Sequence, residues 1–371
     1  MPWSRERSAP ASLEIDNLSK DYGALHAVDD VTLHVQAGEF LTLLGPSGSG
    51  KTTTLRLVAG FLRPTSGTVK IDSTDITNSP PHAREIGMVF QNYALFPHMT
   101  AAQNIAFPLQ MRRVPRSEQK RMIDEALELV QLGGLGDRSP RQLSGGQQQR
   151  IAFARATVFR PRLLLMDEPL GALDRKLRES MQLEIRRLHD ELGITILHVT
   201  HDQEEAMVLS DRIALFDQGK IEQIGPPTEL YERPASVFVA GFLGESNIFH
   251  GKIDRQGGGL AVVGNGLRLR CEAEGAQAWS DDDPAALVVR PERVVLADAD
   301  SAQSQLNERI EGIVRQVIYL GSTVKYQLEA SDQTIFARAD IAAVGELRHE
   351  SDRVAIEWPR KDAVLVRDRV G

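Results

Sequence analysis

The chain has 371 residues, enough for two or three domains, and its 42% apolar and 25% charged residues are ordinary for a soluble globular protein. The 43 basic and 51 acidic side chains give a net charge of −8, which argues against nucleic-acid binding driven by bulk charge. Cys271 is the only cysteine, so the composition excludes a disulfide framework, thiolate-rich zinc sites and CxxC redox chemistry.

The N-terminal residues are polar and lack the apolar stretch of a signal peptide. We expect residues 1–11 to form a disordered tail. The best apolar runs, Leu163–Met166 and Val237–Leu243, are far too short to span a bilayer. The chain is therefore expected to be soluble by itself and to reach a membrane only through a partner.

Between residues 12 and 236, short apolar runs alternate with helical patterns. Three pairs show this alternation: Phe40–Leu44 with Thr52–Phe61, Leu163–Met166 with Leu177–Leu192, and Thr195–Thr200 with Gln203–Leu209. Strands that are apolar on both faces and separated by helices are typical of a parallel sheet covered on both sides. Residues from about 92 to 160 are mostly helical, and Ser117–Leu132 is their clearest amphipathic stretch. The pattern predicts an α/β domain at 12–236 with a helical insertion.

A glycine-rich motif follows the first of these strands. It reads Gly45-Pro46-Ser47-Gly48-Ser49-Gly50-Lys51-Thr52 and matches G-x-x-x-x-G-K-[ST], the phosphate loop of nucleotide-binding proteins. The glycines let backbone N–H groups point at phosphate oxygens, and the following helix N-terminus adds partial positive charge. Lys51 would reach the β- and γ-phosphates, Thr52 would bind Mg²⁺, and Thr53 completes the predicted nucleotide site. The alternative is a chance match, against which the flanking strand and helix argue.

Next along the chain comes a second glycine-rich turn, Leu143-Ser144-Gly145-Gly146-Gln147, directly before the helical run Gln148–Ala156. Backbone N–H groups, a serine hydroxyl and a helix N-terminus again make an anion site, here from Ser144, Gly145, Gly146 and Gln147. The alternative is an ordinary helix start, because serine and glycine are good N-cap residues. One nucleotide does not need two such cradles in one subunit, so two subunits facing head to tail could sandwich two ATP molecules.

Two carboxylates, Asp167 and Glu168, follow the apolar run Leu163–Met166. Strands of a parallel sheet end where α/β folds bind their ligands, which would place both acids beside the phosphate loop. Asp167 would hold the Mg²⁺ shell, and Glu168 would orient or activate the attacking water. Taken alone, the two residues would be better explained as solvated acids at a strand end, and it is the phosphate loop that favours the functional interpretation.

From about Leu13 to Ser236 the sequence resembles the ATP-binding-cassette (ABC) ATPases. The motifs stand in the family's order: the phosphate loop, Gln91, Leu143–Gln147, Asp167-Glu168-Pro169, Gly171-Ala172-Leu173-Asp174 and Thr200-His201-Asp202. Gly171 stands where the family often has serine, which puts a local hydrogen bond in doubt.

The resemblance implies roles for single residues. Tyr22 would stack on adenine, and Gln91 would sense Mg²⁺ and the attacking water. Ser144, Gly146 and Gln147 would contact the γ-phosphate held by the opposite subunit. Asp174 would cross the dimer seam, and His201 would contact the γ-phosphate and hold Glu168. Taken alone, Tyr22 could be ordinary packing, Gln91 a surface strand end and His201 a structural residue.

Residues 237–371 switch to a period of two, with Val324, Tyr326 and Leu328 alternating with polar neighbours. This predicts a small all-β barrel or sandwich after the phosphate-loop NTPase core. Three segments, Phe242–Phe249, Val289–Glu292 and Ile318–Ser322, resemble the regulatory β-domain, of oligonucleotide/oligosaccharide-barrel type, in importer ATPases for sugars, ferric iron, polyamines and phosphonates. Within that group the sequence is most similar to the spermidine/putrescine import ATPases.

The apolar segment Asn92–Met99 suggests a docking surface, although it could also be an internal hydrophobic staple of the insertion. The resemblance implies an ATP- and Mg²⁺-dependent homodimer that docks two transmembrane permease subunits there and serves a solute-binding protein indirectly. It would lie at the cytoplasmic face of the bacterial inner membrane and energise uptake of a small solute, a polyamine by resemblance, without binding nucleic acid. The alternatives are another solute or a soluble ABC ATPase outside transport.

Overall fold

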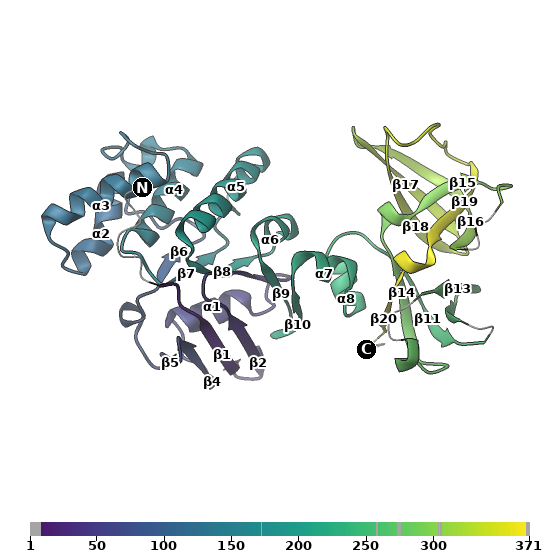
Figure 1. Cartoon of the computed structure of the whole chain (residues 1–371), viewed down its shortest axis with the longest axis horizontal. Coiled ribbons are helices and arrows are strands. Elements are labelled where there is room, and N and C mark those ends of the chain that lie inside the picture. Colours follow the sequence, from purple (N-terminus) through teal and green to yellow (C-terminus); the bar gives the residue numbers. More distant parts are fainter. Residues whose placement is uncertain are drawn as a thin grey trace. The chain divides into compact units, whose positions relative to one another are not determined.

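The computed structural model describes residues 9–171, 173–256, 259–272, 276–302, 304 and 306–368. Residues 1–8 of the expected tail lie outside this range. The chain is held in place from Ala9, because the backbone carbonyl of Ala9 accepts a hydrogen bond from Arg162 at 3.1 Å and Ala11 is fully buried. The chain divides into two compact units, one ending at Pro227 and one beginning at Thr228 (Figure 1).

A six-stranded sheet organises the first unit. Its strands are β3 (Phe40–Leu44), β6 (Gly87–Val89), β7 (Leu163–Asp167), β8 (Thr195–Thr200), β9 (Arg212–Asp217) and β10 (Lys220–Gly225). They lie in the order β10-β9-β3-β8-β7-β6, parallel except for the antiparallel pair of β9 and β10. Every residue of β3, β7 and β8 is buried, as expected for parallel strands covered on both faces. The predicted α/β core is confirmed.

A second, antiparallel sheet covers one side of this core. It consists of β1 (Leu13–Tyr22), β2 (Leu25–Val35), β4 (Ser66–Ile71) and β5 (Thr74–Asp75), in the order β2-β1-β4-β5. Helix α1 (Lys51–Ala59) shares one apolar cluster with both sheets, which includes Leu13, Leu41 and Leu55. The sequence patterns had not indicated this sheet.

Helices form the other side of the first unit. They are α2 (Ala101–Met111), α3 (Arg116–Leu129), α4 (Gly145–Thr157), α5 (Arg175–Leu192) and α6 (Gln203–Leu209). The predicted helical insertion is present as α2 and α3, which pack with α4 in a cluster that includes Ile105 and Ile151. No helix within the described ranges is long and apolar enough to cross a membrane.

The second unit begins with the short helices α7 (Pro227–Glu232) and α8 (Val237–Phe242) and is otherwise all-β, which confirms the prediction. Two antiparallel five-stranded sheets share one core, in which Trp358 stacks on Phe249 at 5.5 Å between ring centroids. The predicted inward residues Val324, Tyr326 and Leu328 are all buried. The strands are β11 (Asn247–Asp254), β12 (Leu260–Gly264), β13 (Leu267–Cys271), β14 (Pro284–Val289), β15 (Val295–Asp298), β16 (Asn307–Tyr319), β17 (Thr323–Ala330), β18 (Gln333–Asp340), β19 (Arg353–Pro359) and β20 (Val364–Arg367).

Arg290, in the segment Val289–Glu292, fastens the two short helices to the β-sheets of the second unit. Its guanidinium donates hydrogen bonds to the carbonyls of Ala240 at 2.9 Å and Tyr231 at 2.8 Å, and it lies 4.0 Å from the centre of the Tyr231 ring. The Tyr231 hydroxyl donates to Glu292 at 2.7 Å. Burial, reinforced by this bond, raises the pKa of Tyr231 to about 12.

Tyr231 should therefore lose its proton at a higher pH than an ordinary tyrosine. Its neutral form contributes stability that is fully present below about pH 10, the ordinary tyrosine pKa, and is lost as the pH rises through about 12. In a phenolate absorbance titration of the wild type minus Tyr231→Phe, we expect a difference curve with its midpoint near pH 12. A midpoint near the ordinary value would contradict the bond to Glu292.

Candidate functional site

The phosphate loop connects β3 to α1 and can be built only with glycine at two positions. A Cβ atom at Gly45 would lie 2.3 Å from the carbonyl oxygen of Phe216, and one at Gly50 would lie 2.4 Å from that of Ala27. Gly50 has φ +105, which side chains rarely adopt. The tight turn that results leads directly into the N-terminus of α1.

Lys51, the first residue of α1, is enclosed by the loop. Its ammonium group donates to the carbonyls of Gly45 and Pro46, both at 2.8 Å, and to the Ser49 hydroxyl at 3.3 Å. Burial lowers the pKa of Lys51, and the negative charges of Glu168 and Asp167 oppose this shift. The loop thus holds one positive charge among oxygen acceptors that phosphate oxygens could replace.

Thr52 and Asp167 bring a hydroxyl and a carboxylate together beside the loop. The Thr52 hydroxyl donates to Asp167 Oδ1 at 3.2 Å, and Thr53 follows it in the first turn of α1. Asp167 ends β7 and is 8% exposed. Burial raises the pKa of Asp167, and the hydrogen bond from Thr52 and the positive charge of Arg56 oppose this rise. These oxygen ligands are of the kind that Mg²⁺ prefers.

Three predicted catalytic residues converge where neighbouring strands end. Gln91 follows β6, Glu168 follows β7 and His201 follows β8. The Gln91 amide donates to Glu168 Oε2 at 3.1 Å, and His201 Nδ1 lies 3.2 Å from Glu168 Oε1. Each carboxylate oxygen of Glu168 thus has one partner.

The backbone of Glu168 is also constrained. Its φ is 45, in the left-handed region, and its N–H donates to the carbonyl of Val199 at 2.9 Å. At Gly171, where serine was expected, an added Cβ would lie 3.7 Å from the Glu168 carbonyl oxygen and 4.0 Å from Oε2. The space beside Gly171 would therefore accept a serine side chain. With glycine at this position, the contacts of Glu168 with Gln91 and His201 are still formed.

The second glycine-rich turn forms the N-terminus of α4. Ser144 is the N-cap: its hydroxyl accepts from the Gln147 N–H at 3.3 Å, and the Gln147 side chain accepts from the Ser144 N–H at 3.0 Å. Gly145 and Gly146 pack against Leu173 and Leu177, where added Cβ atoms would lie at 3.3 and 3.0 Å. In its geometry the turn is therefore a capped helix start, as the alternative interpretation of the sequence predicts. Within the described ranges, no hydrogen bond joins this turn to the phosphate loop of the same chain.

Two further predicted residues lie at the ends of elements. Asp174 is the N-cap of α5 and accepts from the N–H of Leu177 at 3.0 Å. Tyr22, the last residue of β1, is 50% exposed, and the Lys20 ammonium lies 5.2 Å from the centre of its ring. Its aromatic face is thus available to a flat ligand.

Sequence reasoning missed the residues that shape the segment 92–99. Arg155 on α4 donates to the carbonyls of Tyr93 at 2.8 Å and Ala94 at 2.7 Å, and Asn104 on α2 accepts from the Phe96 N–H at 2.8 Å. Tyr93 is buried while Phe96 lines a groove, so the staple and surface interpretations each describe part of the segment. Such long-range side-chain bonds leave no periodic signal in the sequence.

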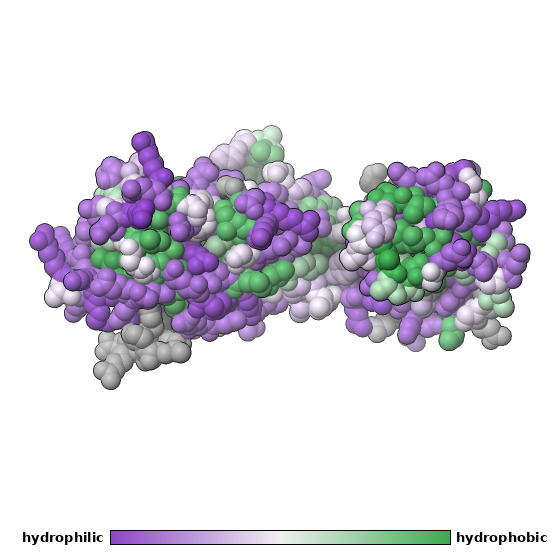
Figure 2. Space-filling model, turned by 90° about the horizontal axis from the view of Figure 1, so that it is seen from above, coloured by the Kyte–Doolittle hydropathy of each residue, from purple (hydrophilic) through white to green (hydrophobic). Residues whose placement is uncertain are grey.

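The groove beside this segment has a volume of about 730 Å³ and is largely apolar. The guanidinium of Arg112 stacks on Phe159 at 3.5 Å from its ring centre, at one side of the groove. In the space-filling view, apolar patches interrupt an otherwise hydrophilic surface (Figure 2). The groove's apolar side chains are Ile86, Met88, Phe90, Phe96, Phe107, Met111 and Phe159.

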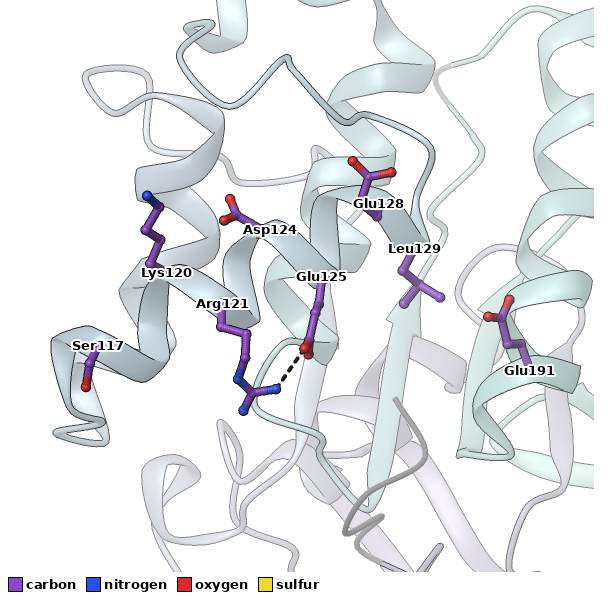
Figure 3. Close-up of a pocket in the computed structure, with 8 residues that line it drawn as sticks. All are labelled: Ser117, Lys120, Arg121, Asp124, Glu125, Glu128, Leu129 and Glu191. Carbon is purple, nitrogen blue, oxygen red and sulfur yellow. Dashed lines mark hydrogen bonds and ion pairs between the residues drawn. The ribbon is translucent and has the colours of Figure 1, made fainter. Parts of the chain in front are cut away.

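A second hollow, of about 610 Å³, lies along α3 opposite Glu191 of α5 (Figure 3). It is lined by residues of both charges, and the Arg121–Glu125 ion pair at 2.7 Å spans successive turns of α3. None of the predicted site residues lines this hollow. It has the character of a solvated helix face.

The comparisons with known proteins agree with this geometry. A family model described as ABC transporter matches residues 28–171, and one described as TOBE domain matches residues 287–366. A solved dimeric ATP-binding cassette, bound to ADP and phosphate after hydrolysis, is 34% identical with a TM-score of 0.52, over 58% of this chain and 98% of that one.

Curated relatives match over nearly the whole chain. The spermidine/putrescine import ATP-binding protein of Thermobifida fusca is 45% identical over 98% of this chain and 95% of the relative. The Fe(3+) ions import ATP-binding protein of Brucella abortus is 42% identical over 96% of this chain and 98% of the relative. The chain therefore belongs to the ATP-binding proteins of ABC importers, ATP-hydrolysing subunits that couple energy to uptake and carry a C-terminal TOBE domain.

Proposed function

We propose that two copies of this chain bind two ATP molecules between them and that hydrolysis drives a membrane permease to import a small solute. The observation that carries this proposal is the Glu168 carboxylate, held by Gln91 at 3.1 Å and His201 at 3.2 Å. Its negative charge acts to raise the pKa of Lys51, against the lowering that burial causes. A fixed carboxylate beside a phosphate loop is what water attack on a γ-phosphate requires.

Mg²⁺ fits the residues at this site. Among the described residues, no three His, Cys, Asp or Glu side chains gather as a protein-only metal site would need. Thr52, Asp167 and Gln91 offer oxygen atoms that could hold Mg²⁺, and nucleotide phosphates would supply further oxygen ligands. When bound, the metal would neutralise charge on the β- and γ-phosphates.

Each side chain then has a physical task. Lys51 would exchange its loop carbonyl partners for phosphate oxygens, and the exposed ring of Tyr22 would stack on adenine. Glu168 would accept a proton or hydrogen bond from the attacking water. Gln91 and His201 would fix the direction of that carboxylate, and His201 would also contact the γ-phosphate.

The second glycine-rich turn, at residues 144–147, supports a nucleotide site that is shared between two copies of the chain. Ser144 is exposed, and its turn makes no hydrogen bond to the phosphate loop of its own chain in the described part of the structure. Two solved relatives are dimeric cassettes, at 34% and 35% identity and TM-scores of 0.52. In the proposed homodimer, Ser144, Gly145, Gly146 and Gln147 face the partner's γ-phosphate, and Asp174 crosses the seam.

Mixing two inactive variants tests the shared site. A heterodimer of Lys51→Ala with Ser144→Arg has both lesions in one composite site and an intact second site, whereas each homodimer has two damaged sites. We expect ATPase activity to return in part on mixing, because copies pair statistically. If every mixture stays inactive although differential tagging shows heterodimers, each site belongs to one chain or the two sites cannot turn over separately.

The groove beside residues 92–99 is the proposed docking surface for two permease subunits. Its apolar lining suits a short amphipathic helix, and Arg155 and Asn104 tie its wall to α4 and α2. The Gln91 that begins this segment also contacts Glu168, so docking and chemistry share one stretch of chain. Docking there would place the chain at the cytoplasmic face of the membrane, peripheral through the permease.

For the solute we propose a polyamine, supplied by a solute-binding protein. Relatives from Thermobifida fusca and Rubrobacter xylanophilus, 45% and 42% identical over at least 98% of this chain, are named for spermidine/putrescine import. The Brucella abortus relative for ferric ions is also 42% identical, which makes iron the second candidate. Uptake of labelled spermidine and of ferric iron, in cells that express this chain with the permease encoded beside it, decides between them.

A further inference from the structure

Two turns that carry proposed site residues are joined by one arginine. The Asp174 turn, Leu173-Asp174, precedes α5, and the His201 turn, His201-Asp202, connects β8 to α6. Arg178 on α5 donates through Nη1 to Asp202 Oδ2 at 2.9 Å and through Nη2 to the Leu173 carbonyl at 3.1 Å. The rigid, planar guanidinium fork therefore fixes the distance between the two turns.

Asp202 is also held from the side of α6. Its Oδ1 accepts from the N–H of Glu205 at 3.1 Å, and its own N–H donates to the Thr200 hydroxyl oxygen at 3.0 Å. The Thr200 hydroxyl donates to Glu205 Oε2 at 2.8 Å. Because Asp202 directly follows His201, the position of its carboxylate sets the backbone that carries the His201 ring.

The inner end of this network is buried. Glu205 Oε1 lies 3.0 Å from Nε2 of the fully buried His198, whose Nδ1 lies 3.1 Å from the Thr42 hydroxyl. Arg178 and Asp202, with side chains 30% and 23% exposed, form the outer, partly solvated end.

We propose that Arg178 and Asp202 form a positioning bridge, through which contact of Asp174 with a partner subunit sets the place of His201 against Glu168. The partner-subunit part of this inference rests on the function proposed above. Without the bridge, each turn keeps its own helix cap, through Asp174 for α5 and Asp202 for α6, but loses its link to the other. Hydrolysis would then suffer more than ATP binding, because His201 acts on the reacting group.

The same helix offers a matched control. Arg186 on α5 likewise bonds to a carbonyl and a carboxylate on another element, the Leu209 carbonyl and Asp211 Oδ1, both at 3.0 Å, and it also lies 3.2 Å from Asp190 Oδ1 on its own helix. Its side chain is 34% exposed, close to the 30% of Arg178, whereas Asp211 at 40% is more exposed than Asp202 at 23%. This pair ties α5 to the end of α6, away from both turns.

Kinetics of the full chain give the first readout. We expect Arg178→Ala to lower kcat about tenfold and to leave KM for ATP within about twofold, as for a displaced catalytic group. Arg186→Ala should leave both constants unchanged while lowering Tm by a similar amount. Arg178→Lys should recover part of kcat, because the ammonium keeps the positive charge beside Asp202 but lacks the planar fork that reaches both acceptors in a fixed geometry.

Amide hydrogen exchange of the nucleotide-free chain gives a second readout that needs no activity. Arg178→Ala should speed exchange in both turns, and Arg186→Ala in neither. Faster exchange confined to the Asp174 turn, wild-type kcat in Arg178→Ala, or an equal loss of kcat in Arg186→Ala would each overturn the bridge. A wild-type chain without ATPase activity would instead refute the proposed function, and the exchange result would still decide whether the two turns are coupled.

Discussion

Lys51→Ala is expected to abolish ATP hydrolysis and to weaken ATP binding on the order of a hundredfold or more. The ammonium group is enclosed by the loop, with two carbonyl partners at 2.8 Å, and no other basic side chain among the described residues shares these partners. Losing one charged contact to a polyphosphate costs about 2 to 3 kcal/mol. Isothermal calorimetry with ATP and Mg²⁺ measures the affinity directly.

Lys70→Ala is the matched control, since Lys70 is also a paired lysine of the first unit, bonded to Asp16 at 2.7 Å. It should bind and hydrolyse ATP normally. An ATP affinity of Lys51→Ala equal to that of the wild type would show that the nucleotide binds elsewhere.

Glu168→Gln is expected to bind ATP normally and to hydrolyse it about a hundredfold more slowly or worse. The amide keeps the shape of the side chain and can still contact Gln91 and His201. It removes the negative charge that we propose orients and activates water. Single-turnover hydrolysis measures the chemical step separately from product release.

Glu184, a carboxylate outside the site, provides the control for Glu168→Gln. Glu184→Gln changes a buried acid that Arg187 holds at 2.8 Å, and it should cost stability without slowing hydrolysis. Near-normal turnover of Glu168→Gln would remove that residue from its proposed task.

The parts of the site that could be predicted from sequence are those encoded locally. The phosphate loop is one continuous motif, and Gln91, Glu168 and His201 each follow a strand of a parallel sheet, so their convergence follows from topology. The buried strand of Leu163–Asp167 was equally predictable, because every residue in it is apolar until the acid that ends it.

The remaining features depend on partners that are distant in sequence or irregular in pattern. Strand β1 shows no clean alternation, because its pairing with β2 shifts register three times, and the antiparallel sheet was missed. Arg155 bonds to Ala94 across 61 residues, and Arg178 to Asp202 across 24. An arginine on an amphipathic helix is ordinarily a solvated residue, and only the fold shows what its guanidinium contacts.

The shared nucleotide site is tested most directly by crosslinking one copy to another. Burial raises the pKa of Cys271 to about 11, and Cys271→Ser removes this thiol altogether. In that background, with Glu168→Gln to retain ATP, one tagged chain carries Ser47→Cys and a differently tagged chain carries Ser144→Cys. We predict that a short thiol-specific crosslinker joins the two chains when ATP and Mg²⁺ are present and not when they are absent. Failure to join them, with ATP binding verified by calorimetry, would contradict the sandwich.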